Sequence, residues 1–234
     1  MHRSGTTLLS QLFNAAGIFQ GVFRDHNSEA FHFLSINQQT LEKSRGDWLT
    51  PVDPKPEDWY DITAEELYAI HFQVGANPQK LKWLKNYPWG WKDPRNTFTL
   101  PMYLKLFPKA KVIHVIRNGK DVALSLKQRN SVEGEVVDER LESLAFNFHL
   151  WEKYVERGNN YAKTIDSFLE VKYEDLLAKD SVVLNKIKTW GNIDLKPHLS
   201  RVKVQKVKAY PQELIDLASR SECYKKWYDK DYSL

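Results

Sequence analysis

The chain has 234 residues, of which 42% are hydrophobic and 13% aromatic, enough for one well-formed core and short for two independent domains. Its 34 basic and 30 acidic residues leave a formal charge of +4, which favours an anionic ligand but is too small a surplus for a nucleic-acid-binding protein. The single cysteine, Cys223, excludes an intrachain disulfide and a multi-cysteine metal cluster. We therefore expect one globular domain over residues 1–234.

Targeting and membrane signals are missing from this sequence. No stretch approaches the ~20 consecutive apolar residues that span a bilayer, and the amino terminus lacks the charged-then-apolar pattern of a signal peptide. With a single cysteine, nothing in the chain requires an oxidising compartment. We expect a cytoplasmic protein with no membrane segment in this chain.

Helical and extended patterns alternate along the chain. Apolar periodicity and capping residues predict helices at about residues 6–17, 28–43, 63–74, 100–107, 120–129, 139–155 and 181–190. Short apolar or β-branched runs predict strands at residues 89–92, 111–116 and 168–173, and the prolines of residues 50–61 predict an extended surface loop. This alternation predicts an α/β fold in which helices flank both faces of a parallel sheet.

The first motif with chemical meaning is a glycine-containing loop at the start of the first predicted helix. It consists of Arg3, Ser4, Gly5, Thr6, Thr7 and Leu8. Amides at a helix start bind phosphate or sulfate, with the macrodipole, hydroxyl donors and an arginine charge in support. A capped helix after an Arg-Ser-Gly turn explains the same residues equally well. Such a loop normally follows a strand, but only Met1 and His2 precede it, so we expect the first strand of the sheet to be missing or truncated.

The loop differs from the one that binds nucleoside triphosphates. The pattern Gly-x-x-x-x-Gly-Lys-Ser/Thr, with its lysine and its metal-binding hydroxyl, is absent. This disfavours a metal-dependent kinase or GTPase, and we expect no metal in the site.

A second motif, from Val115 to Ser125, combines a buried strand, a turn and a helix. Arg117 stands at the carboxyl end of the predicted strand, where ligands of open sheets bind, and its guanidinium suits bidentate contact with a phosphate. Ser125 and Arg129 are one helical turn apart on the following helix and share a face. Taken singly, each of these residues also fits a solvated surface.

Together the two motifs resemble the donor-binding signatures of sulfotransferases that use 3′-phosphoadenosine-5′-phosphosulfate (PAPS). The resemblance covers residues 1–130 well and the Tyr173-Glu174-Asp175-Leu176 run more loosely. It implies that the loop binds the 5′-phosphosulfate, that Arg117 and Ser125 bind the 3′-phosphate, and that Tyr173 lies near the adenine or the 3′-phosphate. Because Arg129 shares a helix face with Ser125, we expect it to help to hold the donor. A core tyrosine is the alternative for Tyr173. The implied reaction is a metal-independent in-line transfer to a hydroxyl or amine that leaves adenosine 3′,5′-bisphosphate.

The subtype resembles tyrosylprotein and bacterial sulfotransferases more than the cytosolic small-molecule enzymes. Arg3 and the Lys92-Asp93-Pro94 run are similar to that group, in which a glutamate after the first helix is the base, and Glu29 is the nearest match here. A carboxylate can take the acceptor's proton, and Lys92 with Arg3 can stabilise the charge on the leaving oxygen. Glu29 in the first turn of a helix also fits a plain dipole interaction, and His26 is the fallback base.

The acceptor is open among a carbohydrate, a small alcohol or phenol, and a peptide tyrosine. Five aromatic residues can either stack on such an acceptor or pack in the core: Trp48, Trp59, Tyr60, Trp89 and Trp91. The resemblance implies that a basic carboxyl-terminal segment closes over the nucleotide, and residues 200–226 contain Arg201, Lys203, Lys206 and Lys208. The Arg-Lys-Gly-x-x-Gly-x-x-Lys motif of the cytosolic enzymes is absent, so none of these residues is assigned singly. His114 is expected to be a core histidine. A catalytically silent nucleotide-binding module, or a truncated sulfotransferase fragment, is the second hypothesis.

Overall fold

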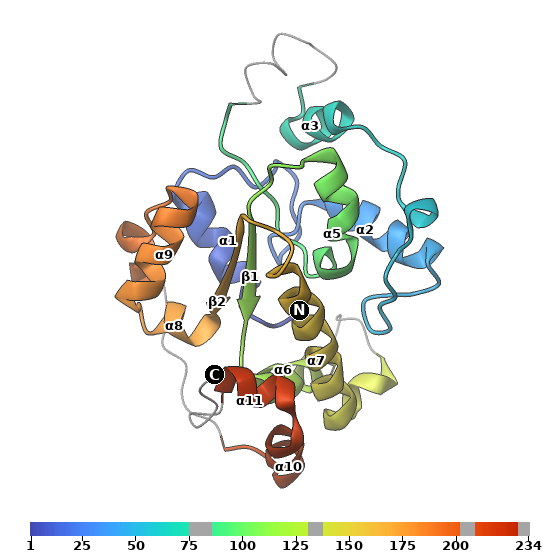
Figure 1. Ribbon diagram of the computed structural model, residues 1–234, viewed down its shortest axis with the longest axis vertical. Helices are drawn as coiled ribbons and strands as arrows, with labels where there is room; N and C mark the ends of the chain where they lie inside the picture. The colour runs from blue at the N-terminus through green and yellow to red at the C-terminus, as the bar shows by residue number, and fades with distance from the viewer. Residues whose placement is uncertain (75–85, 131–137, 202–208, 229–234) are drawn as a thin grey trace. The chain divides into compact units, whose positions relative to one another are not determined.

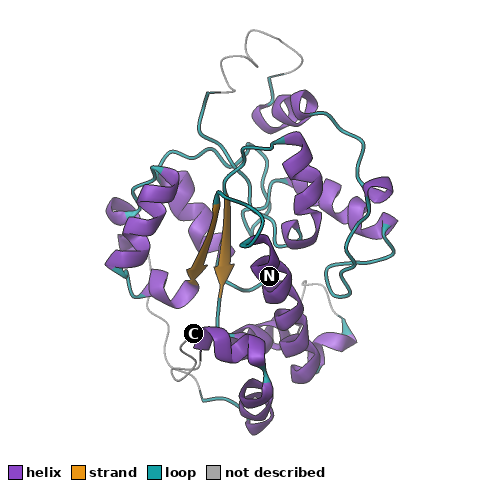
Figure 2. Ribbon diagram, viewed as in Figure 1, coloured by secondary structure: helices purple, strands orange, loops and turns teal. Residues whose placement is uncertain are grey.

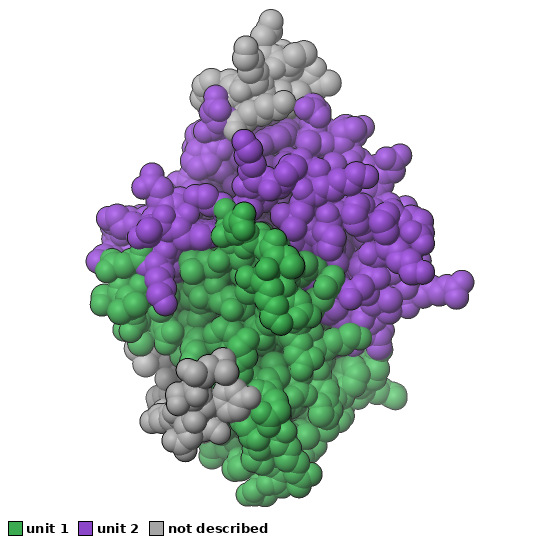
Figure 3. Space-filling view, in the orientation of Figure 1, with its two compact units in different colours: residues 1–5, 112–185, 202–234 green, residues 6–111, 186–201 purple. Residues whose placement is uncertain are grey.

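The computed structural model describes residues 1–74, 86–130, 138–201 and 209–228. The chain divides into two compact units, which Figure 3 colours separately. Unit 1 comprises Met1–Gly5, Val112–Asn185 and Val202–Leu234, and unit 2 comprises Thr6–Lys111 and Lys186–Arg201. The expectation of a single domain over residues 1–234 stays a prediction.

Unit 1 is built on a parallel sheet (Figures 1 and 2). Strand β1 (Val112–Ile116) pairs in parallel with β2 (Phe168–Lys172), and Val115 lies opposite Val171. The apolar run of β1 ends on buried side chains, as expected for a strand inside an α/β fold. The predicted α/β class with a parallel sheet is confirmed, and the described residues contain two strands.

Helices join and follow the two strands of unit 1. In chain order they are α6 (Gly119–Asn130), η2 (Glu139–Glu142), α7 (Leu144–Tyr161), α8 (Tyr173–Leu177), the start of α9 (Ser181–Gly191), α10 (Gln212–Arg220) and α11 (Glu222–Tyr228). Both strand arrows point toward the end of the unit that carries α6, α10 and α11 (Figure 1). Parallel strands need a long crossover, and α6 and α7 supply it here.

The turn between β1 and α6 is held by a buried tryptophan of α7. Trp151 is fully buried, and its Nε1 donates a 2.9 Å hydrogen bond to the carbonyl of Arg117. A β-carbon on Gly119 would lie 2.7 Å from the Trp151 ring, so only glycine lets α6 begin this close to α7. The position of Arg117 at the strand end therefore depends on the packing of α7.

Unit 2 is helical, with an aromatic core. Its elements are α1 (Thr6–Ala15), α2 (Phe31–Lys43), η1 (Pro56–Asp58), α3 (Ala64–Phe72), α5 (Asn96–Leu106), the end of α9 and η3 (Lys196–Arg201). Phe33 is fully buried and stacks on Trp91 with ring centroids 4.2 Å apart. Trp59, Tyr60 and Trp89 also pack against this core. Core packing is thus the observed role of these aromatics and of Trp91.

Most of the predicted elements are present, and four predictions need correction. Residues 89–92 form no strand, because within the described part of the chain their one ladder contact is an isolated bridge between Phe19 and Trp89. Helix α5 begins at Asn96 instead of residue 100, and the predicted helix 139–155 is divided into η2 and α7, with Ser143 capping the latter. Helix α2 begins at Phe31 instead of residue 28, because residues 25–29 form a turn.

Candidate functional site

The loop of residues 3–8, which is predicted to bind an anion, has a backbone that requires glycine at one position. Arg3 and Gly5 both have positive φ, 62° and 83°, and α1 begins at the next residue, Thr6. A β-carbon on Gly5 would lie 2.0 Å from Cδ2 of Tyr173, so the loop approaches that ring more closely than any other residue would permit. Ser4 is buried, whereas Thr6, Thr7 and Leu8 form the first turn of α1. The predicted helix start at this loop is confirmed.

Unit 1 brings the two sequence motifs into direct contact. Arg117 Nη1 donates a 2.9 Å hydrogen bond to the carbonyl of Arg3, and Arg3 Nε donates a 2.9 Å hydrogen bond to Ser125 Oγ. Arg117 and Ser125 are each 7% exposed, so neither is a solvated surface residue. Arg129 lies one turn after Ser125 on α6 and is half-buried. Residues predicted to bind one donor are therefore neighbours in space.

Tyr173 completes this cluster as the first residue of α8. The guanidinium carbon of Arg117 lies 5.1 Å from its ring centroid, a cation–π contact. Burial raises the pKa of Tyr173, and the positive charge of Arg117 opposes that rise. Arg117 also faces Asp121 at 3.8 Å. The ring thus supports both Arg117 and the loop at Gly5.

A second group in unit 1 was not found from the sequence. The ammonium of Lys120 lies 4.4 Å from the ring centroid of Tyr210 and 5.3 Å from that of Tyr224, and burial lowers the pKa of Lys120. Asn118 Nδ2 donates a 3.1 Å hydrogen bond to Tyr224 Oη. The only signal for this group was the Asn118-Gly119-Lys120 turn inside the second motif, since the tyrosines come from the distant carboxyl-terminal part of the chain.

Unit 2 contains a buried ionic cluster around Glu29. Glu29 is 3% exposed; its Oε1 lies 2.8 Å from Lys92 Nζ, and its Oε2 lies 3.3 Å from Arg95 Nη1. Arg95 also pairs with the buried Asp93 at 3.0 Å. Burial and the charge of Asp93 raise the pKa of Glu29, while Lys92 and Arg95 partly offset the rise. The predicted pair of Glu29 and Lys92 meets in space, and Arg95, which directly follows the Lys-Asp-Pro run, was missed.

The loop before α2 explains why Glu29 is not part of a helix. Asp25 Oδ1 accepts hydrogen bonds from the backbone amides of Asn27 (2.9 Å) and Glu29 (2.7 Å), and Ser28 has a positive φ of 65°. These features hold residues 25–29 in a turn, so α2 starts only after them. The helix-dipole explanation of Glu29 is therefore wrong. Thr7 Oγ1 donates a 3.0 Å hydrogen bond to the carbonyl of Asn27, which ties this turn to the first turn of α1.

The histidines differ in their surroundings. His26 is exposed on the turn, with its Nε2 3.0 Å from Asn27 Nδ2. His114 is 9% exposed, with its Nδ1 3.4 Å from Glu170 Oε1, and burial lowers its pKa. The prediction of a core histidine at 114 is confirmed. Lys203, Lys206 and Lys208 lie outside the described residues, as does the side chain of Arg201.

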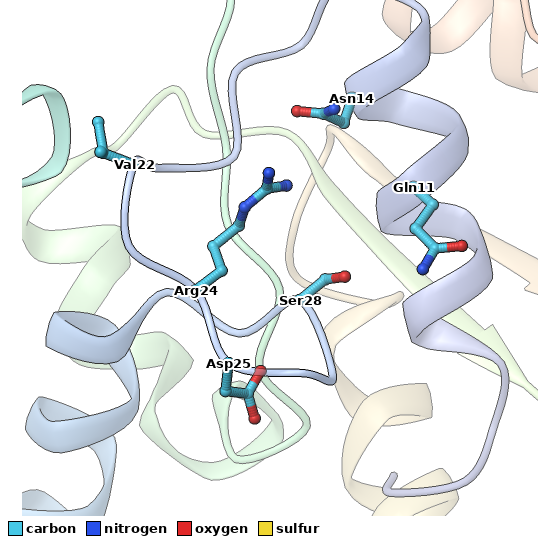
Figure 4. A pocket seen from close by; sticks show the side chains of 6 residues that line it. All are labelled: Gln11, Asn14, Val22, Arg24, Asp25 and Ser28. Carbon is cyan, nitrogen blue, oxygen red and sulfur yellow. The ribbon is translucent and has the colours of Figure 1, made fainter.

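A pocket of ≈ 390 Å³ lies in unit 2 beside the turn that precedes Glu29. Figure 4 shows its walls: one is α1, and the other is the segment that leads into the turn. The lining residues are Gln11, Asn14, Val22, Arg24, Asp25 and Ser28. This pocket was not predicted, because nothing local marks Arg24 or the exposed face of α1 as a site.

The described residues contain neither a candidate metal site nor a membrane-spanning helix. Among residues 1–74, 86–130, 138–201 and 209–228, no group of three or more histidine, cysteine or acidic side chains is placed to hold a metal ion. Within the same described ranges, no helix has the length and apolar content to cross a membrane.

Comparison with known proteins identifies the family. Neither a curated protein nor a solved structure matches the chain. A family model described as the sulfotransferase family matches residues 1–197, which include both motifs, Glu29, Lys92 and Tyr173. Because the match covers most of the chain, the protein belongs to the sulfotransferase family, whose members are transferases of sulfuryl groups.

Proposed function

We propose that this protein transfers a sulfuryl group from PAPS to a hydroxyl or amine acceptor without a metal ion. The observation that carries the proposal is the contact between the two motifs in unit 1. Arg3, from the loop, hydrogen-bonds to both Arg117 and Ser125, from the β1–α6 region. Two arginines and a buried hydroxyl that meet at a strand end suit a ligand with more than one phosphate-like group.

The backbone of the loop itself suits the binding of a phosphosulfate. Gly5 takes a left-handed conformation where no β-carbon fits, and the ten-residue helix α1 starts directly after it. Backbone amides at such a helix start favour an anion, and the charge of Arg3 adds to them. PAPS would supply the sulfuryl group, with adenosine 3′,5′-bisphosphate as the product. Arg117, Ser125 and Arg129 would hold the 3′-phosphate, with Tyr173 beside them.

Glu29 is the proposed general base. Its pKa is raised by burial, which makes the carboxylate a better proton acceptor than an exposed one. The acceptor oxygen loses its proton to Glu29 as it bonds to sulfur, and the bond from sulfur to the oxygen of the 5′-phosphate breaks. Lys92 and Arg3 would stabilise the charge on that leaving oxygen. The hydrogen bond from Thr7 to the Asn27 carbonyl supports this assignment, because it joins the loop's helix to the turn that carries Glu29.

The buried pair of Glu29 and Lys92 also supports the proposed subtype. A glutamate after the first helix that pairs with the lysine of a Lys-Asp-Pro run is similar to the tyrosylprotein and bacterial type of sulfotransferase. His26 is the weaker candidate for the base, because it is exposed whereas Glu29 is buried among charges. A silent nucleotide-binding module remains the alternative, and it would keep the donor site but show no transfer.

The test is thermal stability with adenosine 3′,5′-bisphosphate, with ATP, and with ATP plus Mg²⁺. A ligand at about 100 times its dissociation constant stabilises the folded state by ~2.7 kcal/mol, which gives a measurable shift in Tm. We expect the bisphosphate alone to stabilise the wild type, and Arg117→Ala to abolish the shift. Arg220→Ala, at an exposed arginine of the same unit, should keep it.

Since Arg117→Ala also removes packing on Tyr173, Ser125→Ala serves as a milder second variant and should reduce the shift without loss of the fold. A preference for ATP with Mg²⁺, or an equal shift in wild type and both variants, would overturn the donor assignment. Transfer of labelled sulfate from PAPS to any acceptor then separates the enzyme from the silent module.

A further inference from the structure

The pocket beside the Glu29 turn is lined by several polar side chains that make no hydrogen bond with other described residues. The side chains of Gln11, Asn14, Arg24 and Ser28 line it, and none of the four makes a hydrogen bond or ion pair with another described residue. Figure 4 shows Arg24 and Ser28 extending from the loop toward α1, which carries Gln11 and Asn14. A ligand in this space would meet two amides, a hydroxyl and a guanidinium.

Arg24 is the positive charge of the pocket, and among the described residues it forms no ion pair with the acid beside it. Asp25 also lines the pocket, but its carboxylate accepts hydrogen bonds from the backbone amides of Asn27 and Glu29 and from Asn27 Nδ2. Those donors occupy both oxygens of Asp25 and hold its carboxylate in the turn, whereas the side chain of Arg24 is exposed. A carboxylate or sulfate group on a ligand would provide the planar or multidentate acceptor that a guanidinium prefers.

The residues that line the pocket favour a polyhydroxyl acceptor over an aryl acceptor. None of the six lining residues is aromatic, and Val22 is the only apolar one. An aryl acceptor would lack a stacking partner here, while a polyhydroxyl molecule would find amide and hydroxyl groups that both donate and accept. The volume of ≈ 390 Å³ is within the usual range for small-molecule sites.

The location of the pocket connects it with the proposed chemistry. Ser28, on its wall, immediately precedes Glu29, and Thr7 ties the same turn to the first turn of α1. Gln11 and Asn14 lie further along that helix. A molecule bound here would therefore contact residues adjacent in sequence to the proposed base and residues of the helix that starts at the donor loop.

We propose that this pocket is an acceptor subsite for a carbohydrate-like molecule that carries a carboxylate or sulfate group, with Arg24 binding that group. This inference rests on the proposed sulfuryl transfer and gives it a substrate class. Arg24 is a specificity residue and takes no part in the bond changes. Gln11, Asn14 and Ser28 hydrogen-bond to the hydroxyls and orient the molecule.

The experiment compares two probes that differ only at C6, p-nitrophenyl β-D-glucuronide with a carboxylate there and p-nitrophenyl β-D-glucoside with a neutral hydroxymethyl group. Their dissociation constants are measured by calorimetry on the full chain saturated with adenosine 3′,5′-bisphosphate, for wild type, Arg24→Gln and Arg45→Gln. Arg45 is an exposed arginine of the same unit that does not line the pocket, so it controls for the change in net charge. Labelled sulfate transfer from PAPS to each probe gives kcat/KM in parallel.

Wild type and Arg45→Gln should bind the glucuronide about tenfold more tightly than the glucoside, because one charge-assisted contact distinguishes the two probes. Arg24→Gln should bind both probes equally and keep the wild-type affinity for the bisphosphate. Equal affinities in the wild type, or a preference that survives Arg24→Gln, overturn the subsite while the bisphosphate still binds. If the bisphosphate itself does not bind, the proposed function fails, and the subsite fails with it.

Discussion

Replacing Gly5 by alanine should lower the free energy of unfolding by about 2–5 kcal/mol through two separate costs. The first is the backbone, since a φ of 83° lies in the left-handed region, which costs ~1–2 kcal/mol for a residue with a β-carbon. The second is steric, since that carbon would lie 2.0 Å from Cδ2 and 2.3 Å from Cε2 of Tyr173. Overpacking of this kind typically costs ~1–3 kcal/mol.

Gly17 offers a matched control for the backbone cost. Its φ is 91°, and a β-carbon there would meet nothing within 4 Å. Gly17→Ala should therefore cost only the backbone part, ~1–2 kcal/mol. Tyr173→Ala provides the complementary control, because in the double variant with Gly5→Ala the new methyl group has room. We expect the double variant to be ~1–3 kcal/mol more stable than the sum of the single changes predicts.

Urea denaturation followed by tryptophan fluorescence measures all of these changes, with the slope m checked for constancy. Binding of adenosine 3′,5′-bisphosphate, measured on the fraction of Gly5→Ala that remains folded, should also weaken, because the shifted loop no longer presents its amides together. Two results would contradict the expected steric cost: a Gly5→Ala change that costs no more than Gly17→Ala, or a Tyr173→Ala change that does not relieve it. Either result would mean that the loop does not press against the ring.

The other predictions concern titratable groups of unit 2. If Glu29 is the base, its raised pKa means that kcat/KM rises with pH through a value above 4.5. Glu29→Gln should lower the rate by about 10²–10⁴ while bisphosphate binding persists. A pH profile unchanged by this variant would exclude Glu29 as the base. Lys92→Met removes a cation that lowers the pKa of Glu29, so the same profile should move to higher pH, and a move to lower pH would contradict the pairing. Burial lowers the pKa of His71 from 6.5 to about 3 and that of its neighbour His32 to about 4. Below pH 6.5 the unfolded state therefore binds more protons than the folded state. The stability that these histidines contribute is fully present above pH 6.5 and is lost as the pH falls toward the folded-state pKa values. Between pH 7 and pH 5 the His71 contribution is ~2 kcal/mol, and His71→Leu should flatten the pH dependence of urea denaturation by that amount.

Local features of the sequence were sufficient to predict several helices and strands. Thr63 caps α3 and exchanges hydrogen bonds with Glu66, as the Thr-x-x-Glu pattern predicted, and β1 matches its apolar run. Arg117 follows that strand as expected. These features depend on residues within one or two turns of each other, so their free energies can be judged without knowledge of the fold. The family was also evident from two short motifs in order, and the match over residues 1–197 confirms it.

Contacts between distant segments were decided only by the tertiary structure. Among the residues that the structure describes, residues 89–92 have one bridging partner, Phe19, so they form no strand despite a strand-like composition. Glu29 lies in a turn because Asp25 accepts its amide, and its charge is matched by Arg95 as well as Lys92.

Short-range patterns of the sequence therefore indicated the α/β class, the glycine turn at the start of α1 and the family, because each is encoded in residues close together in the chain. The tertiary structure decided the Gly5–Tyr173 approach, the bonds of Arg3 to Arg117 and Ser125, and the polar pocket at Arg24. Each of these depends on which side chains meet after the chain has folded, and that outcome is set by the packing of many residues together, which no local pattern records.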